Sequence, residues 1–381
     1  MVQCSEVYFT SMKITNNDEP LPMKFRRLLV TAGLSKFKLD KKFIAIKTHF
    51  GETGNMAYLR PNYAKVVVDL VKEAGGRPFL CDCNTLYPGK RKNALEHLEI
   101  AYEHGFSPFS TGCHILIGDG LDGTDEVLVP VEGGVYVKEA KIGRAIMDAD
   151  MFISLNHFKG HMETGFGGAL KNIGMGCGSR AGKMEMHSAS SPGVKGDRCI
   201  SCKKCSRFCG SDAITYEDGT AFINPDICVG CGHCIAACPV DAIFPKFDEN
   251  NQILDAKIAE YAKAVLSGRR SFHISFVIDV SPLCDCFGAN DIPIVPNIGI
   301  FVSRDPVALD MACADAVNAQ MPTKGSILAE RVAEQSTDHD HAAEKGSDHF
   351  MTLYPSHDWR AMIDHAVSLG IGNADYELIE V

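Results

Sequence analysis

Apolar and polar positions in the first 190 residues alternate between short apolar runs and longer segments of helical period. Runs that predict buried strands lie at residues 43–46, 78–81, 115–117 and 151–155. A helix is predicted from Pro61 to the Gly75-Gly76 pair, because its apolar residues fall on one face. The alternation predicts an α/β fold: an open, mostly parallel sheet with helices on both faces.

The same pattern returns near the end of the chain. Helices are predicted there at residues 255–266 and 306–319 and strands at 272–280 and 298–302, just as further helices are predicted at residues 94–102 and 139–148 in the first part. We therefore expect one α/β core in two parts, residues 1–190 and 251–381, with an inserted α+β domain at residues 191–250. Residues 336–357, which include four histidines, predict a solvated surface loop, with metal binding as the lesser alternative.

The inserted segment contains two cysteine runs of identical spacing, Cys-x2-Cys-x2-Cys-x3-Cys, 29 residues apart. Three thiolates on a tight loop can hold three corners of an iron–sulfur cube, and in two-cluster ferredoxins the fourth ligand comes from the other run. We therefore predict a bacterial-type ferredoxin domain with two 4Fe-4S clusters. One cluster is assigned to Cys199, Cys202, Cys205 and Cys238, and the other to Cys228, Cys231, Cys234 and Cys209.

Zinc or free thiols are the alternatives for these cysteines. Zinc takes four ligands in total and would leave the fourth cysteine of each run unexplained. Gly210 stands where a proline usually follows the fourth cysteine, as Pro239 does in the second run. The spacing therefore favours the two clusters.

A second candidate site is the glycine-rich loop at residues 156–187. It follows the carboxyl end of a predicted strand, where open α/β sheets bind ligands. Its histidines and lysines offer acid–base groups and positive charge, and its glycines let the backbone approach an anion. The alternative is a glycine-rich turn with solvated lysines. We select as catalytic candidates His157, Lys159, His161, Lys171 and His187, and as cofactor-binding candidates Gly165, Gly167, Gly168, Asn172 and Lys47.

Two Cys-x-Cys pairs also follow predicted strands. If they converge, a third metal or cluster could bind at Cys81, Cys83, Cys284 and Cys286. The alternative is that these thiols are small buried hydrophobic side chains.

Composition narrows the class of protein. The chain has 381 residues, 16 cysteines and a net charge of −10. The negative charge argues against nucleic acid or an anionic membrane surface as the main partner. No apolar run is long enough for a membrane helix, and residues 1–13 show no signal peptide. Reduced thiols in this number fit the cytoplasm, and we expect an anaerobic cell.

Nucleotide chemistry is not predicted. The glycines at residues 165–168 and 174–178 miss the dinucleotide-binding pattern Gly-x-Gly-x-x-Gly, and the chain has no P-loop.

From about residue 7 to residue 317 the chain resembles the uncharacterised iron–sulfur centre proteins, domain of unknown function 362. The resemblance rests on residues 47–55, 58–61, 84–87, 119–120, 157–161, 165–176 and 305–310, and on the two cysteine runs. It implies an iron–sulfur protein whose reaction is not established.

A more distant resemblance is to the nickel-pincer lactate racemases, through the pattern His161-x3-Gly165-Phe166-x-Gly168-x2-Lys171 and the later His187. It implies that His161 acts as an acid/base, that Lys171 carries a tethered nickel-pyridinium cofactor and that His187 ligates nickel. The chain lacks that family's Asp-x-Thr-Arg-Pro stretch, and its second catalytic histidine could correspond to His97, His104 or His114.

Three functions follow from these features. The favoured one is an oxidoreductase whose clusters exchange electrons with a small anionic substrate or a cofactor in the α/β core, served by a ferredoxin- or reductase-type partner protein. The alternatives are a nickel-pincer isomerase or racemase of a small hydroxy acid, and a dedicated electron or cluster carrier.

Overall fold

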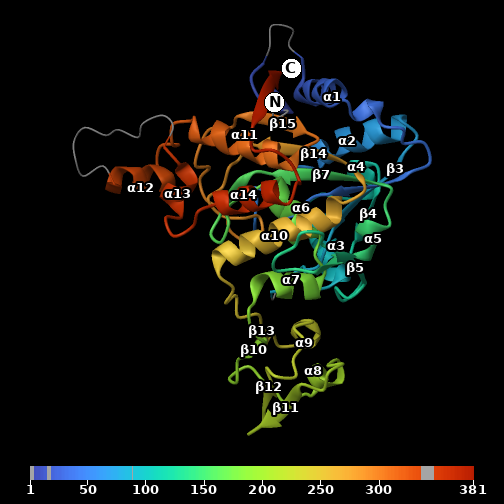
Figure 1. The fold of residues 1–381 in the computed structure, drawn as a ribbon, viewed down its shortest axis with the longest axis vertical. Helices are drawn as coiled ribbons and strands as arrows, with labels where there is room; N and C mark the ends of the chain where they lie inside the picture. The colour runs from blue at the N-terminus through green and yellow to red at the C-terminus, as the bar shows by residue number, and fades with distance from the viewer. Residues whose placement is uncertain (1–3, 15–18, 88, 336–346) are drawn as a thin grey trace.

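The fold is described by a computed structural model that covers residues 4–14, 19–87, 89–335 and 347–381. Its centre is an eight-stranded sheet in the order β16-β1-β15-β14-β7-β2-β3-β4 (Figure 1). These strands are β1 (Ser5–Ser11), β2 (Phe43–Lys47), β3 (Arg77–Asp82), β4 (His114–Ile117), β7 (Met151–His157), β14 (Arg270–Val277), β15 (Gly299–Ser303) and β16 (Tyr376–Glu380).

Strand direction confirms the predicted fold class. In this sheet β15 runs antiparallel to both of its neighbours, and every other pairing is parallel. Strands β14, β7, β2 and β3 are adjacent and parallel, so their carboxyl ends meet at one edge of the sheet. The outer strands β1 and β16 had not been predicted from the sequence.

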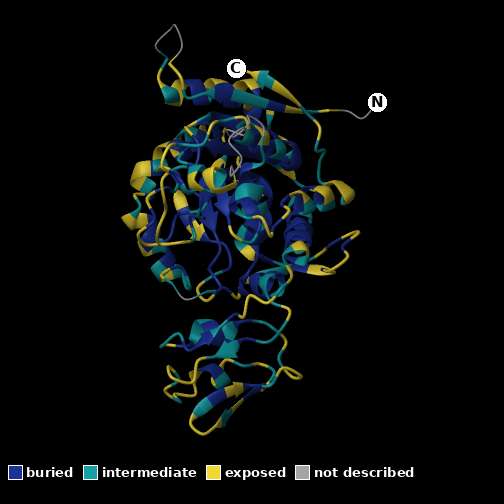
Figure 2. Cartoon of the chain, turned by 90° about the vertical axis from the view of Figure 1, so that its left-hand side faces the viewer, coloured by how far each residue is buried: buried dark blue, intermediate teal, exposed yellow. Residues whose placement is uncertain are grey.

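Helices cover both faces of the sheet, because successive side chains of a buried strand point to opposite sides. Ile44 and Ile46 pack with α1 (Leu21–Thr31), α2 (Pro61–Glu73) and α3 (Ala94–Glu103), whereas Ala45 faces the opposite layer. That second layer contains α6 (Ala169–Cys177), α10 (Asn251–Leu266), α11 (Pro306–Asn318) and α14 (Arg360–Ser368). Figure 2 shows the resulting buried centre.

The remaining elements around the core are short. They are η1 (Leu34–Lys36), α4 (Pro108–Thr111), α12 (Ile327–Gln335) and α13 (His349–Leu353). Over the described residues, no helix combines the length and the apolar character that a membrane crossing requires.

Residues 139–148, predicted as one helix, form β6 (Glu139–Gly143) and the short α5 (Arg144–Met147). Strand β6 pairs with β5 (Glu126–Pro130) in an antiparallel hairpin. Ala140 and Ile142 are buried while Glu139 is exposed, so the apolar period here is two rather than 3.6.

The prediction of a glycine-rich loop at residues 156–187 was also wrong as to its structure. It contains the hairpin β8 (Lys159–His161) and β9 (Gly165–Gly167), followed by α6 and α7 (Arg180–His187). Glycine lowers helix propensity, but tertiary packing overrides it here. A Cβ atom on Gly174 would lie 2.1 Å from the carbonyl oxygen of Ile258, so glycine lets α6 approach α10 closely.

The predicted surface loop at residues 336–357 needs a similar correction. Residues 336–346 lie outside the described ranges. His349 and His357 are buried: His349 Nε2 lies 2.8 Å from the carbonyl oxygen of Gln320, and His357 Nε2 lies 2.9 Å from Asp255 Oδ2. These two histidines belong to the core rather than to a solvated loop.

The cysteine-rich segment, residues 191–250, leaves the core after α7 and returns at α10. It contains β10 (Gly193–Val194), α8 (Lys204–Arg207), β11 (Ile214–Glu217), β12 (Thr220–Ile223), α9 (His233–Ala237) and β13 (Ile243–Phe244). In Figure 1 it extends below the core, while β7 before it and β14 after it pair in the large sheet. Its buried apolar residues form a separate small cluster.

The helix contact at Gly174 is testable. We expect Gly174→Ala to lower the free energy of unfolding by about 1–3 kcal/mol, because the added methyl group overlaps the α10 backbone. Gly210→Ala is the matched control, since an added Cβ there meets no atom within 4 Å. Denaturant unfolding of the two variants would measure the difference, and equal stability would contradict the close packing.

Candidate functional site

The candidate site is a cavity of about 720 Å³ at the carboxyl ends of β2, β3 and β7. Its walls also include the turn after β8, the start of α6, α7 and the loop that follows β14. Loops at this edge of an open parallel sheet are the usual place for a ligand.

The floor of the cavity holds a buried ion pair. Lys47, the last residue of β2, lies with Nζ 3.0 Å from Asp82 Oδ1, and Asp82 ends the neighbouring strand β3. Lys47 Nζ also donates to Asn172 Oδ1 at 2.7 Å. Burial lowers the pKa of Lys47, but the Asp82 carboxylate and the neighbouring thiols of Cys177 and Cys81 together hold that pKa above its usual value. Lys47 is therefore a cation.

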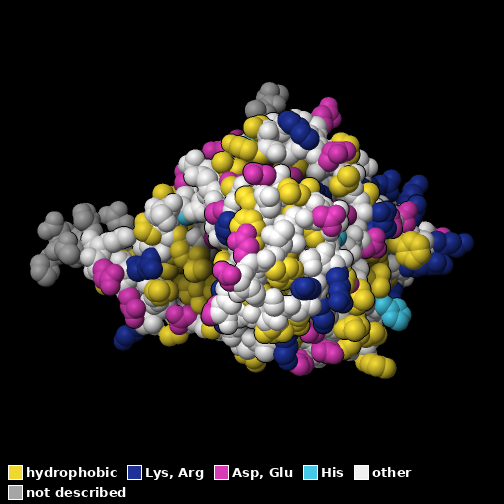
Figure 3. All heavy atoms as spheres, turned by 90° about the horizontal axis from the view of Figure 1, so that it is seen from below, with side chains coloured by type: hydrophobic (Ala, Val, Ile, Leu, Met, Phe, Trp, Pro, Cys, Tyr) yellow, Lys and Arg dark blue, Asp and Glu magenta, His cyan; other side chains and the backbone are white. Residues whose placement is uncertain are grey.

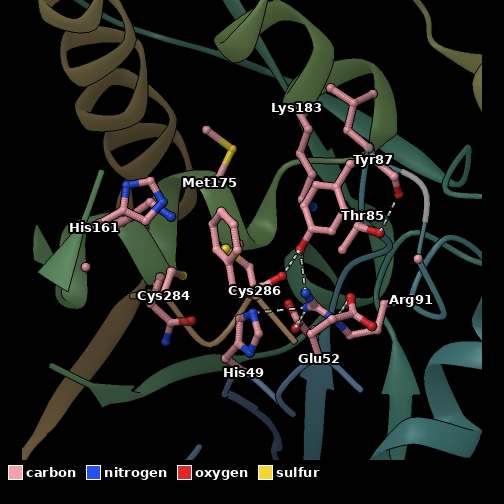
Figure 4. A pocket seen from close by; sticks show the side chains of 18 of the residues that line it. His49, Glu52, Thr85, Tyr87, Arg91, His161, Met175, Lys183, Cys284 and Cys286 are labelled. Carbon is pink, nitrogen blue, oxygen red and sulfur yellow. Dashed lines mark hydrogen bonds and ion pairs between the residues drawn. The ribbon is translucent and has the colours of Figure 1, made fainter. Parts of the chain in front are cut away.

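A second network lies beside this pair and had not been selected from the sequence (Figure 4). Arg91 is buried and donates from Nε to Glu52 Oε2 at 3.1 Å and from Nη2 to the Tyr87 hydroxyl at 2.5 Å. Its Nη1 lies 3.0 Å from His49 Nε2. Burial, and then the Arg91 guanidinium, hold the pKa of His49 well below its usual range, so the ring is neutral.

Asp285 fixes the loop after β14 from inside the protein. Its buried carboxylate lies 2.9 Å from His157 Nδ1 and 3.5 Å from Lys159 Nζ. The other ring nitrogen of His157 lies 2.9 Å from the carbonyl oxygen of Ile278. His157 does not line the cavity, and both of its ring nitrogens are engaged by these two contacts.

The structure brings His161, Lys171 and His187 to one cavity wall, as the spacing had suggested. Burial lowers the pKa of His187 to about 3, assisted by the positive charge of Lys171. Lys171 makes no hydrogen bond or ion pair with any residue that the structure describes. Among the lysines and arginines on the wall it is therefore available to a ligand, whereas Lys47 and Arg91 are paired.

Cys284 and Cys286 complete that wall. Their sulfur atoms and a ring nitrogen of His161 all lie within 4.8 Å of one another. A hydrogen bond from the Cys286 thiol, together with Lys171 and Lys159, holds the pKa of Cys284 well below its usual range.

The other predicted residues divide into two groups. Those that line the cavity are Lys47, Lys159, Gly167, Gly168 and Asn172. Gly165 does not: its φ is +67°, and a Cβ there would meet Trp359. None of His97, His104 and His114 is a lining residue. His49 would have been found by asking which histidine follows the first core strand.

The glycines were expected to let the backbone bind an anionic ligand, but at the start of α6 the backbone N–H groups are already occupied. The backbone N–H groups of Ala169 and Leu170 donate to the Asp310 carboxylate at 2.6 and 2.9 Å. A Cβ on Gly168 would lie 2.2 Å from Asp310 Oδ1. Gly168 therefore makes room for a carboxylate of the chain itself, which occupies the helix N-terminus.

The cysteines of the inserted segment gather in two groups. Cys199, Cys202, Cys205 and Cys238 line one small hollow, so both runs contribute to it. Burial, and then the neighbouring thiols, raise the pKa of Cys234 to about 12. These neighbours are Cys231, Cys228, Cys205 and Cys209. The residues of the hollow are those of one predicted set of four, and the neighbours of Cys234 include the other predicted set together with Cys205 of the first.

The 29-residue repeat is visible in the backbone. Ser201 and Lys203 have positive φ, as do Gly230 and Gly232 at the matching places, and Asp212 and Asp241 form a third such pair. Two N–H···S hydrogen bonds also match: Ala213 to Cys209 at 3.3 Å and Ala242 to Cys238 at 3.2 Å. The two halves therefore present their sulfur atoms in the same way.

The two Cys-x-Cys pairs are placed differently from the predicted group of four. Within the described ranges, the group close enough to share one metal ion is His161, Cys284 and Cys286. Cys81 is buried in the core away from the cavity wall, and its thiol interacts with Cys177.

Residues 44–315 match the model of DUF362, described as a domain of unknown function. The chain belongs to the DUF362 family. No curated protein matches it.

Two solved structures are distantly similar to this DUF362 chain. One is a protein from Thermotoga maritima determined by a structural genomics consortium, with 14% identity, a TM-score of 0.39 and coverage of 77% of this chain. The chain spans only 57% of that protein. The other is the lactate racemase apoprotein from Thermoanaerobacterium thermosaccharolyticum, with 14% identity, a TM-score of 0.43 and coverage of 98% of this chain and 82% of that one. At these TM-scores neither likeness carries an argument about the reaction.

The raised pKa of Asp310, the residue that caps the start of α6, can be tested. Burial raises its pKa to about 7, above the value of about 3.9 expected in the unfolded chain. Its contribution to stability is therefore greatest when it is protonated, and it declines as the pH rises toward 7. The difference in unfolding free energy between wild type and Asp310→Asn should fall by up to about 1.4 kcal/mol per pH unit between about pH 5 and 7. Denaturant titrations at several pH values would measure it, and a difference independent of pH would contradict the raised pKa.

Proposed function

We propose that this DUF362 chain is an iron–sulfur oxidoreductase. The cysteine-rich segment would hold two 4Fe-4S clusters, and the cavity would bind a small anionic molecule that exchanges electrons with them. The observation that carries the proposal is the position of Leu86, which lines the cavity and also packs in the apolar cluster around Cys205 and Cys234.

The donor sets fit the clusters. The hollow lined by Cys199, Cys202, Cys205 and Cys238 offers four cysteine sulfurs, one of them from the other run, and Cys209 and Cys238 each accept a backbone N–H. Such hydrogen bonds to sulfur tune the reduction potential. When bound, the clusters would supply one-electron transfer.

The contact between the segment and the core supports a path toward the cavity. Gly232, in the second run, approaches Arg180 and Leu86; a Cβ there would lie 3.4 Å from Leu86 Cδ1. Arg180 is buried and donates from Nη1 to the carbonyl oxygen of Thr85 at 2.9 Å, which holds the loop that carries Leu86. Lys92, from the same loop, pairs with Asp241 of the segment at 3.0 Å. The group of Cys228, Cys231, Cys234 and Cys209 therefore faces the core.

The cavity supports the choice of an anionic molecule. Lys171 would bind the negative charge, because its ammonium group has no partner among the described residues. The buried cations of the cavity wall are already bonded: Lys47, Lys159 and Arg91 to carboxylates, and Lys183 to the carbonyl oxygen of Gly178. His187 is neutral at pH 7, so a ring nitrogen is available as a proton acceptor.

A partner protein would approach the cysteine-rich segment. Ile200, Ile227 and Val229 are exposed there, next to the cysteine runs. Figure 3, seen from that end, shows charged side chains of both signs interspersed with hydrophobic ones. A ferredoxin- or reductase-type protein in the cytoplasm fits such a mixed surface better than nucleic acid does.

A nickel-pincer isomerase is the second candidate function. The observation in its favour is the convergence of His161, Lys171 and His187 on one cavity wall. In that case Lys171 would tether the cofactor and His187 would ligate nickel.

The cluster assignment predicts about eight irons and eight sulfides per chain after purification without oxygen. Cys238→Ser should change the same electron paramagnetic resonance signal of the reduced protein as Cys199→Ser, because both residues hold one cluster. Cys209→Ser should instead match Cys228→Ser. Cys113→Ser, in a buried thiol of the core, is the control and should keep all the iron. If Cys238→Ser altered the signal of the second run, the crossed assignment would be wrong.

The cavity proposal predicts that a small anion reoxidises the reduced clusters. A panel of 2-oxo acids would be mixed with photoreduced protein, and recovery of the cluster absorbance would be followed. Each 2-oxo acid would take two electrons, one from each cluster, and two protons to give the 2-hydroxy acid. Lys171→Ala should weaken the apparent affinity for the active anion about 10- to 100-fold, because it removes a charged hydrogen-bond donor. The reduction of the clusters should be unchanged.

Lys65→Ala is the control, since Lys65 is exposed on α2 and pairs with Asp69. Reoxidation by no member of the panel would favour a dedicated electron carrier. A mass adduct on Lys171 in protein from the native host would instead favour the nickel-pincer isomerase.

A further inference from the structure

His161, Cys284 and Cys286 form a compact set of metal-binding atoms that the two clusters do not use. The two sulfur atoms and a ring nitrogen lie within 4.8 Å of one another, and all three side chains line the cavity (Figure 4). In a tetrahedral zinc site, with zinc–sulfur bonds of about 2.3 Å, two sulfur ligands lie about 3.8 Å apart. The spacing therefore suits a single ion.

Contacts of the intervening residue Asp285 and of the adjacent backbone hold the two thiols in place. Cys284 and Cys286 flank Asp285, whose carboxylate is buried against His157 and Lys159. The carbonyl oxygen of Asp285 accepts a hydrogen bond from the backbone N–H of Glu52 at 2.9 Å. Asn55 donates from Nδ2 to the carbonyl oxygen of Phe287 at 3.1 Å. With Asp285 held inward, both thiols reach the cavity wall.

We propose that His161, Cys284 and Cys286 bind one borderline-soft divalent cation of the zinc type, with its fourth position open to the cavity. Two thiolates and one imidazole are the protein ligands of a known class of catalytic zinc site, in which water or substrate takes the fourth place. A 720 Å³ cavity with the free ammonium group of Lys171 on its wall provides room for an anionic fourth ligand. The site does not depend on the proposed electron transfer.

Binding requires one local change. His161 Nδ1 accepts the backbone N–H of Glu163 at 3.1 Å, so the neutral ring carries its proton on Nε2. For Nε2 to bind a cation, the ring proton must move to Nδ1 and the turn at residues 161–163 must release that hydrogen bond. Bound metal should therefore alter this turn.

The test uses the full chain with its iron content measured in each sample. Protein purified without oxygen is incubated with one equivalent of Zn²⁺ and desalted, and zinc and iron are then counted. Wild type should retain about one zinc, with X-ray absorption showing two sulfur ligands and one imidazole nitrogen. Cys286→Ser and His161→Gln should each retain at least about 10-fold less zinc at unchanged iron. Cys113→Ser should match wild type.

Three results would overturn the proposal. One is equal zinc retention by wild type, Cys286→Ser and His161→Gln. Another is wild type that binds no zinc and whose peptide mass shows a Cys284–Cys286 disulfide, which would make the pair a redox dithiol. The third is zinc whose X-ray absorption shows four sulfur ligands together with lost iron, which would place it in the cysteine runs. Because iron is counted separately, failure of the two-cluster proposal would be visible independently of this site.

Discussion

The buried ion pair between Lys47 and Asp82 is the interaction on which the site depends. Both residues end adjacent parallel strands, so the sheet itself sets their separation. Removing one partner of such a pair leaves an uncompensated buried charge, which costs about 3–5 kcal/mol. Asn172 joins the pair to α6, and Asn172 in turn donates to Asn156 at 2.7 Å. One charge pair thus connects three strands and the helix that carries Lys171.

Compensation of charge explains which groups remain for a ligand. Arg91 is neutralised by Glu52, and Lys159 by Asp285. Even the N-terminus of α6, a natural anion site, is occupied by Asp310. Lys171 and the nearby thiols of Cys284 and Cys286 are consequently the part of the cavity wall that can bind a ligand without breaking an existing ion pair.

The cysteine-rich segment joins the core through few elements. Its own apolar cluster is small, and its strands are short. Leu86 and Met184 of the core pack in that cluster, so the segment and the cavity wall share apolar contacts. In the proposed redox function, the cysteine-rich segment and the cavity would therefore be in direct contact through these two residues.

Local pattern determined much of the fold. The apolar runs identified β2, β3, β4, β7 and β15, and Pro61 and Pro306 marked the starts of α2 and α11. The pattern failed at residues 139–143, where a two-residue period was read as a helix, and at residues 169–187, where glycines concealed two helices. Glycine in α6 is explained only by the approach of α10 to Gly174, a contact between residues far apart in the chain.

The site shows the same division. Spacing within one segment was sufficient to select His161, Lys171 and His187, because residues of one loop and helix stay close whatever the rest of the fold does. The two cysteine runs were likewise recognised from their spacing, because both lie within one short segment. Only the tertiary structure brought Arg91 to His49 and grouped Cys284 and Cys286 with His161 rather than with Cys81 and Cys83. These contacts depend on the order of parallel strands in the sheet. That order is set by long-range packing and not by the residues beside each motif.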